Sequence, residues 1–436
     1  MLNWIWLGMA LAAVLIAGST GKMEAIASGA VKGAEAAVTI AIGLIGIMTV
    51  WMGIMRLAER SGFVQLIARA LRPVLRWLFP DVPHDHPAMG SMVMNIAANM
   101  LGLLNAATPL GLRAMKDLER LNPHPGTATN AMCTFLAINT GSVQLIPITA
   151  IGVLAAEGSV APYSIVGTAL IATCFSSAAG LIAVKLFEKM RVFRAVPMEV
   201  PQRTEVKEES SPAEVQITPE KEPLKFWQLL VMIAFVGFFG WAIYEMAFGR
   251  FLQDPNRGEF IRVVDAISKA AIPFLLVFFP LFAALKGVKV YEELVEGGKE
   301  GFNVAIRIIP YLVIILLAIF MLRESGGIAL MTEAVRPALD AIGFPSDLLP
   351  LALMRPLSGS GSFGIFTEMV KQFGPDSLIV RMAGTLYGST ETTFYVIAVY
   401  FGAVGIKRTR HAIPAGLIAD LAGIIAAVII CRMMFE

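Results

Sequence analysis

Long runs of apolar residues dominate this sequence and limit what it can fold into. They occupy residues 2–18, 36–57, 89–110, 129–155, 162–187, 226–247, 263–285, 302–322, 348–369, 379–405 and 412–431. Most approach or exceed the about 20 residues that a helix needs to cross a bilayer. Hydrophobic residues make up 56% of the chain and charged residues only 16%, unlike a soluble domain. The sequence therefore predicts an all-α, polytopic membrane protein.

Charge, cysteines and motifs exclude several function classes. A net charge of +2, with basic residues dispersed beside the apolar runs, gives no reason to expect a nucleic-acid partner. The three cysteines lie inside apolar runs without a CxxC motif, so we expect no metal site and no cofactor. The common hydrolase and nucleotide-binding motifs do not occur, so we expect no enzyme activity and no catalytic residues.

The order of segments repeats along the chain. Residues 70–75 (ALRPVL) match residues 334–339 (AVRPAL), and a Phe-Pro pair follows each. Around these anchors both halves contain the same parts. The parts are an apolar span, a short polar helix, a second span, an amphipathic Arg-Pro stretch, a polar or small-residue apolar segment, and two further spans.

The repeat divides the chain into four parts. Residues 1–194 form the first repeat and residues 248–436 the second. Residues 195–225 are rich in Pro, Glu, Ser and Lys and predict a disordered cytoplasmic linker. Residues 226–247 add a transmembrane helix that has no equivalent in the first half.

Basic residues predict the orientation. If segment 89–110 enters the membrane and returns, the basic residues from Arg56 to Arg120 share one face, which the positive-inside rule makes cytoplasmic. A full crossing would divide them between two sides, so we favour a re-entrant hairpin, with a counterpart at 348–369. An odd number of spans then precedes the second half, which predicts two inverted repeats. Three basic residues fall on the outer side in this scheme, against the rule: Arg250, Arg257 and Arg262.

Two spans carry polar interruptions at matching positions. One reads NTGSVQ at residues 139–144 and the other GSTETT at residues 388–393. Polar groups deep in a bilayer usually face a partner or a cavity, and glycine gives the backbone a place to unwind. We therefore predict a broken transmembrane helix in each half, with both breaks lining one site. Discontinuous helices in inverted repeats are typical of many secondary transporters.

The candidate substrate-binding residues lie in the breaks and in the hairpins. They are Asn139, Thr140, Ser142, Gln144, Ser389, Thr390 and Glu391 in the breaks, Asn95, Asn99 and Asn105 in the first hairpin, and Arg355, Ser358, Ser360 and Ser362 in the second. Glu391 corresponds in position to Gln144, and this asymmetry suits a polar substrate with donors and acceptors. Its alternative role is that of a protonated structural carboxyl. The asparagines either face a substrate or join helices by hydrogen bonds.

Two charged residues keep alternatives open. Arg355 precedes a Gly-Ser run whose backbone amides, at a hairpin tip, would form an anion-binding nest. Arg355 either neutralises an acidic substrate group or pairs with Glu391 or Glu368. Asp420 lies in the last apolar run and has no acidic equivalent in the first half. It is either a proton or cation coupling site or a carboxylate paired within the bundle.

These motifs resemble a known family. The stretches MNIAANMLGLLNAATPLGLRAM and FLAINTGSVQLIPI resemble spore maturation protein A, and RPLSGSGSFGIF and GSTETTFYV resemble spore maturation protein B. The chain looks like a fusion of the two, which belong to the wider nucleoside recognition or Gate domain group. Nucleoside transporters of that group have a Gly-Gln-Thr-Glu motif that binds the nucleobase. The tetrapeptide at residues 388–391 resembles it, with Ser in place of Gln.

The resemblance implies a secondary transporter in the bacterial inner membrane. The solute would be small and polar, nucleoside-like or another metabolite, moved by an elevator or gating mechanism. The alternative is a membrane scaffold or sensor that works with a cell-envelope partner, as in spore maturation. We expect contacts with membrane lipid, while a homodimer and a cell-envelope enzyme stay open as partners. An intramembrane enzyme would require Glu391 and Asp420 to be adjacent.

Overall fold

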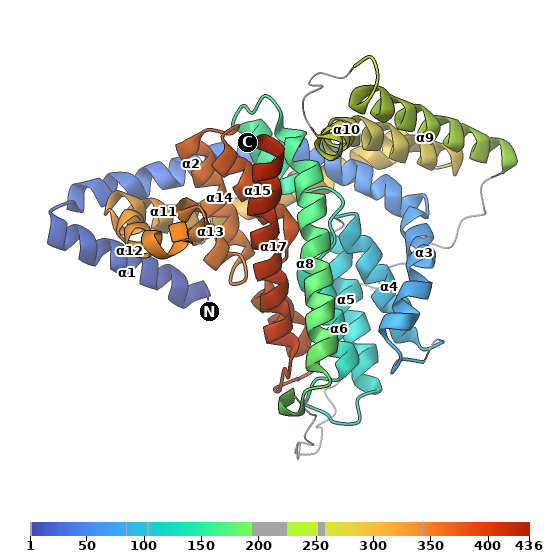
Figure 1. The fold of residues 1–436 in the computed structure, drawn as a ribbon, viewed down its shortest axis with the longest axis horizontal. Helices are drawn as coiled ribbons and strands as arrows, with labels where there is room; N and C mark the ends of the chain where they lie inside the picture. Colours follow the sequence, from blue (N-terminus) through green and yellow to red (C-terminus); the bar gives the residue numbers. More distant parts are fainter. Residues whose placement is uncertain (1, 84, 103, 194–224, 252–257, 342) are drawn as a thin grey trace.

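The chain folds almost entirely into helices (Figure 1). The computed structural model describes residues 2–83, 85–102, 104–193, 225–251, 258–341 and 343–436. Within these ranges the strand-type pairing of the backbone is limited to one isolated bridge, between Thr127 and Arg408. The all-α prediction is therefore confirmed. The linker expected at 195–225, apart from Lys225, and Arg257 lie outside the described residues.

The helices follow the apolar runs. The first half holds α1 (Leu2–Thr20), α2 (Met23–Arg60), α3 (Phe63–Leu78), α4 (Pro87–Met100), α5 (Leu104–Arg120), α6 (Asn130–Gly141), α7 (Ile148–Ala156) and α8 (Ile165–Phe187). Helix α9 (Phe226–Ala247) lies between the two halves in the sequence. The second half holds α10 (Glu259–Leu285), α11 (Val290–Glu324), α12 (Gly327–Ala341), α13 (Leu349–Met354), α14 (Gly359–Phe373), α15 (Leu378–Ser389), α16 (Thr393–Gly402) and α17 (Ala412–Phe435). Short 3₁₀ turns lie at Pro162–Ser164, Arg191–Phe193 and Ser346–Leu348.

The short polar helices expected before the second span of each half do not exist as separate elements. Each polar stretch is the first part of a long helix, α2 or α11. Neither stretch contains a proline, and its exposed charged side chains let the helix continue out of the apolar region.

Helices α2 and α11 form a close antiparallel pair between the two halves (Figure 1). A Cβ added at Gly33 would lie 2.8 Å from the Leu316 carbonyl oxygen, and one at Gly53 would lie 2.7 Å from that of Leu294. Small residues allow this approach of two backbones. Arg56 extends the contact with ion pairs to Glu293 at 2.7 Å and Glu300 at 2.6 Å.

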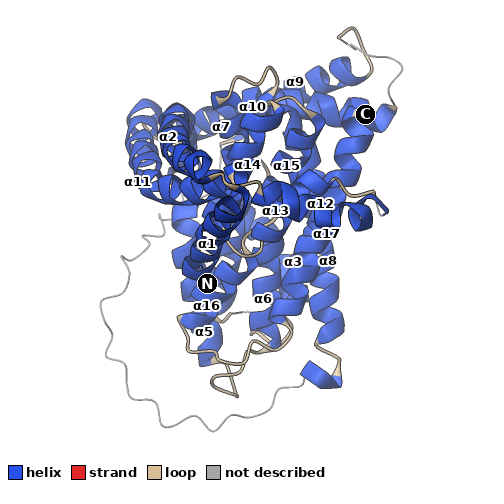
Figure 2. Ribbon diagram, turned by 90° about the vertical axis from the view of Figure 1, so that its left-hand side faces the viewer, coloured by secondary structure: helices blue, strands red, loops and turns tan. Residues whose placement is uncertain are grey.

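Helices α8 and α17 form a second antiparallel pair between the halves and run side by side in both views (Figures 1 and 2). Their backbones also approach at small residues, because a Cβ at Gly180 would lie 3.0 Å from that of Ala419. Ser176 Oγ donates to the Ala419 carbonyl at 2.8 Å. The corresponding helices of the two halves thus pack against each other, but the inverted relation of the halves stays a prediction.

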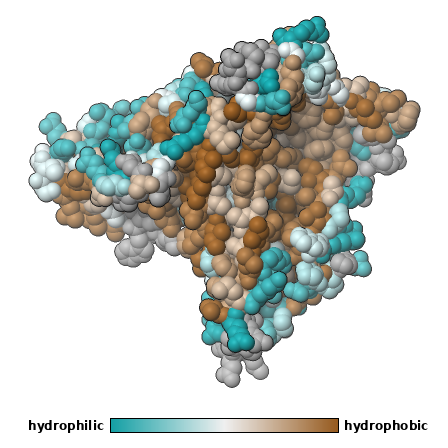
Figure 3. All heavy atoms as spheres, in the orientation of Figure 1, coloured by the Kyte–Doolittle hydropathy of each residue, from teal (hydrophilic) through white to brown (hydrophobic). Residues whose placement is uncertain are grey.

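The surface fits a bilayer. Five described helices are each long and apolar enough to cross a bilayer as a single helix: α2, the segment Pro162–Phe187, α9, α10 and α17. Apolar residues cover the middle of the face in Figure 3, and hydrophilic residues gather toward its ends. On α17 the exposed apolar residues recur every three or four positions: Leu417, Leu421, Ile425 and Ile429. Such a stripe is typical of a helix that faces lipid.

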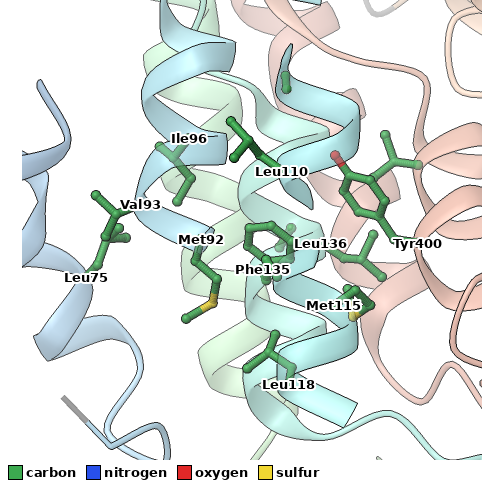
Figure 4. Close-up of a cluster of buried hydrophobic side chains, with 14 of the residues drawn as sticks. Leu75, Met92, Val93, Ile96, Leu110, Met115, Leu118, Phe135, Leu136 and Tyr400 are labelled. Atoms are coloured by element: carbon green, nitrogen blue, oxygen red, sulfur yellow. The ribbon is translucent and has the colours of Figure 1, made fainter. Parts of the chain in front are cut away.

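A buried apolar cluster joins the first hairpin to helices from both halves (Figure 4). It contains Met92 of α4, Leu110 of α5, Phe135 of α6 and Tyr400 of α16. The Phe135 and Tyr400 rings stack with centroids 5.9 Å apart. This cluster holds the hairpin against the broken helices, where the candidate site lies.

Candidate substrate site

Both predicted broken helices are present. Helix α6 ends at Gly141 and α7 begins at Ile148, while α15 ends at Ser389 and α16 begins at Thr393. In the first break, Ser142 has φ 23° and ψ 86°, outside helical geometry, and Pro147 has no amide hydrogen to continue a helix. In the second, Thr390 is extended, with φ −141° and ψ 164°. Each apolar segment therefore crosses the fold as two short helices.

The two breaks meet. The backbone amide of Glu391 donates to the carbonyl oxygen of Thr140 at 2.9 Å. Gln144 Nε2 donates to Glu391 Oε1 at 3.3 Å. Glu391 and Gln144 are both partly exposed, whereas Thr140 is buried. The residues that correspond in position in the two repeats are therefore in contact, and their outer faces keep free acceptor capacity.

Arg355 ties the second hairpin to the second break. Its guanidinium donates to the carbonyl oxygen of Thr390 and lies over the Tyr387 ring, 4.6 Å from the centroid. Glu368, one of the expected partners of Arg355, pairs with Arg323 instead. The other, Glu391, shares its hydrogen bond with Gln144. Arg355 is thus held by a carbonyl and a ring, and its buried Nε atom has no hydrogen-bond partner in the described part of the chain.

The Gly-Ser run does not form the hairpin tip, and that prediction is wrong. The turn comes earlier, at residues 355–358, and the run makes the first turns of α14. Ser358 starts the helix, because its Oγ accepts from the Gly361 amide at 3.0 Å. The amide of Ser362 donates to the Ser358 carbonyl, so two amides of the proposed anion nest are occupied.

The three serines of this hairpin bond mainly within it. Ser362 Oγ donates to the Ser358 carbonyl at 2.6 Å, and Ser360 Oγ lies 3.4 Å from Ser358 Oγ. Ser358 and Ser362 are buried, while Ser360 is partly exposed. A Cβ at Gly359 would lie 3.1 Å from Thr392 Oγ1. The start of α14 therefore touches the second break through its backbone more than through its hydroxyls.

The first hairpin joins the site through a polar network. Asn99 Nδ2 donates to Asn139 Oδ1 at 2.9 Å, and Tyr400 Oη donates to the same oxygen at 3.4 Å. Asn95 is fully buried and donates to the Ala107 carbonyl at 2.7 Å and to Tyr400 Oη at 3.2 Å. Asn95 therefore joins α4 to α5 and α16 by hydrogen bonds, which is one of the two roles expected for the asparagines. The side chain of Asn105 lies outside the described residues.

The last span also reaches the second break. Thr393 Oγ1 donates to Asp420 Oδ2 at 2.5 Å. The equivalent helix α8 reaches the first break, where Thr173 Oγ1 and Ser177 Oγ each donate to the Gly141 carbonyl at 3.0 Å. These bonds satisfy a carbonyl that the end of α6 leaves without a helical partner.

Four residues of this site were not predicted as contacts from the sequence: Tyr387, Tyr400, Thr173 and Ser177. In an apolar run, an aromatic residue at a binding site cannot be distinguished by sequence from one that faces lipid or the core. Tyr387 and Tyr400 could therefore not be singled out. Thr173 and Ser177 lie in a run of small and hydroxyl residues, ATCFSSAAG, which is the one signal that would have found them.

A family model matches the chain in two parts, one in each half. Residues 41–187 and 305–407 match the Gate family, described as nucleoside recognition. The chain is 45% identical to spore maturation protein B of Bacillus subtilis (strain 168) over 175 residues, which are 40% of this chain and 98% of that protein. It is 41% identical to spore maturation protein A of the same organism over 187 residues, 43% of this chain and 95% of that protein.

A solved structure also aligns with most of the chain. The YdaH transporter of Alcanivorax borkumensis, whose topology is described as unusual, gives a TM-score of 0.38 at 13% identity. The alignment covers 89% of this chain and 84% of the transporter.

Proposed function

The chain belongs to the nucleoside recognition (Gate) family, and on that premise we propose that it is a secondary transporter of a small polar solute in the bacterial inner membrane. One observation carries the proposal: the breaks of two discontinuous helices, one from each half, meet at Thr140 and Glu391. Unwound backbone inside a membrane is tolerated where it is buried in protein or lines a water-filled cavity. Two such breaks in contact are the arrangement with which many transporters bind substrate.

The side chains at this junction favour a polar, uncharged or donor-rich solute. Gln144 offers an amide, and Glu391 offers a carboxylate oxygen beyond the one that Gln144 occupies. Asn99 and Asn139 add amide groups from the first hairpin and α6. A nucleoside or a metabolite with similar donors and acceptors fits this set, and the family description points the same way.

The hairpins supply the gating part of the proposal. Each ends against a break: Asn99 contacts Asn139, and Arg355 contacts Thr390. In an elevator or gating mechanism, these contacts would open and re-form while the α2–α11 pair stays fixed. The close backbone contacts and ion pairs of α2 and α11 support a fixed role for that pair.

Uptake by purified protein in liposomes tests the proposal. We expect at least one solute from a panel of nucleosides, nucleobases and small polar metabolites to accumulate under an imposed sodium or proton gradient. Glu391→Gln should lower that uptake by roughly tenfold or more, the effect of losing about 1.4 kcal/mol of binding free energy. The matched control is Glu292→Gln, at an exposed position in the first turn of α11. Unchanged uptake by the Glu391 variant would remove this residue from the site.

The second candidate function is a membrane scaffold or sensor that works with a cell-envelope partner. The observation that favours it is the description of two relatives by a role in spore maturation. In this case no solute of the panel would move, and the protein would co-purify from native membranes with one envelope enzyme. Neither candidate assigns a catalytic step to Glu391 or Asp420, whose hydrogen bonds go to Gln144 and Thr393 respectively.

A further inference from the structure

Asp420 is a buried carboxylate with one oxygen unused. The residue is 2% exposed, and its Oδ2 accepts from Thr393 Oγ1 at 2.5 Å. Oδ1 is also buried and has no hydrogen-bond partner among the described residues. An unpartnered carboxylate oxygen in a low-dielectric interior is costly, so buried carboxylates bind a proton, a cation or a donor group.

The helix face around Asp420 is lined by the threonine side chains of the two breaks. A Cβ at Gly416 would lie 2.8 Å from Thr393 Cγ2 and 3.5 Å from Thr140 Oγ1, and one at Gly423 would lie 2.7 Å from Thr390 Cγ2. The glycines on either side of Asp420 therefore let both breaks approach α17. Thr390 is 3% exposed, and its Oγ1 also lacks a hydrogen-bond partner in the described part of the chain.

The charges around Asp420 do not neutralise it by direct contact. Arg355 and Glu391 are the charged groups that act on it among the described residues. Arg355 donates to the Thr390 carbonyl, and Glu391 bonds with Gln144. The elements packed on this face of α17 otherwise contribute hydroxyls, such as Ser176 of α8, which donates to the Ala419 carbonyl.

We propose that Asp420, Thr393 and Thr390 form a site for a small monovalent cation, a proton or a sodium ion, at the junction of the two broken helices. Oxygen ligands suit a hard cation, and a single carboxylate balances a single positive charge. No three His, Cys, Asp or Glu side chains converge anywhere in the described ranges, as a multivalent metal would need. The inference rests on the proposed transport, because an ion held at the second break would couple its gradient to movement of the solute.

The first experiment measures sodium binding without transport. Thermal unfolding of the purified protein in lipid nanodiscs is followed as sodium chloride replaces choline chloride at constant ionic strength and pH 8. Sodium should raise the unfolding temperature in a saturable way, and Asp420→Asn should lose this rise. Asp265→Asn is the matched control, since Asp265 of α10 pairs with Lys269 at 2.7 Å, and it should keep the rise.

The second experiment measures the proton. If sodium has no effect, the infrared carbonyl band of a protonated carboxyl should be present at pH 7 in the wild type and lost in Asp420→Asn. If the Asp420→Asn variant does not fold, Thr393→Val replaces it, because this variant keeps the carboxylate. Thr393→Val should shift the pH at which the carboxyl band disappears, or weaken sodium binding at least tenfold. Absence of both the sodium response and the carboxyl band would overturn the site. Because neither readout needs a substrate, this result is distinguishable from a failure to transport.

Discussion

The guanidinium of Arg355 lies over the ring of Tyr387 on α15 and donates to the carbonyl oxygen of Thr390, the residue just after α15 ends. One side chain thereby fixes the turn of the second hairpin to the second break. The contact combines a cation–π interaction with a hydrogen bond to a backbone group that α15 leaves unpaired.

Arg355→Lys should destabilise the protein and impair uptake. Lysine keeps the charge but lacks the planar group that stacks and donates in a fixed direction. We expect the free energy of unfolding to fall by about 1–3 kcal/mol, because a buried carbonyl loses its donor. Thermal unfolding in nanodiscs measures this. Arg336→Lys, at an exposed position in α12, is the control and should leave stability unchanged.

Tyr400→Phe should weaken the contact between the first hairpin and α16. The hydroxyl accepts from Asn95 and donates to Asn139, so its removal takes one hydrogen bond from each of two buried amide groups, which keep their bonds to Ala107 and Asn99. We expect a loss of about 1 kcal/mol in unfolding free energy. Tyr395→Phe changes the same atom on the same helix at a position 57% exposed and should have no effect. Equal stability of both variants would contradict a role for this network.

Gly33→Ala should separate α2 from α11. The new Cβ would lie 2.8 Å from the Leu316 carbonyl oxygen, and a backbone atom cannot move away without shifting the helix. We expect destabilisation by about 1–3 kcal/mol, as for other overpacked sites. Gly46→Ala on the same helix meets no atom within 4 Å and should be neutral or slightly stabilising. Unfolding curves of the two variants give a direct comparison.

His411 should make stability depend on pH. It precedes α17, is fully buried, and neither ring nitrogen has a hydrogen-bond partner among the described residues. Burial, with help from the nearby charges of Arg410 and Lys185, lowers its pKa from 6.5 to about 4. Between these two values the unfolded chain binds more protons than the folded one.

The free energy of unfolding should therefore fall as the pH decreases from 6.5 to about 4. The total fall from this group is about 3 kcal/mol, and its contribution is constant outside that window. His411→Leu should remove this part of the pH dependence. Unfolding midpoints measured at several pH values for both proteins would show it, and parallel curves would contradict the assignment.

The broken helices could be predicted because the signal is local. A glycine beside hydroxyl and amide or carboxylate side chains within an apolar run is poorly compatible with a continuous span. The position of the hairpin tip could not be predicted, because glycine and serine are common both in turns and at helix starts, and here Ser358 caps the start of α14. The contact of Thr393 with Asp420 depends on how α16 returns against α17, which no local pattern specifies.

The placement of α2 and α11 in opposite halves has a consequence for folding. Their contact forms within one polypeptide, so its effective concentration is set by the intervening chain and does not vary with expression level. If the peptide bond were cut between the halves, for example within residues 194–224, this pairing would become a bimolecular reaction. Assembly of the two fragments would then depend on how densely each one populates the membrane.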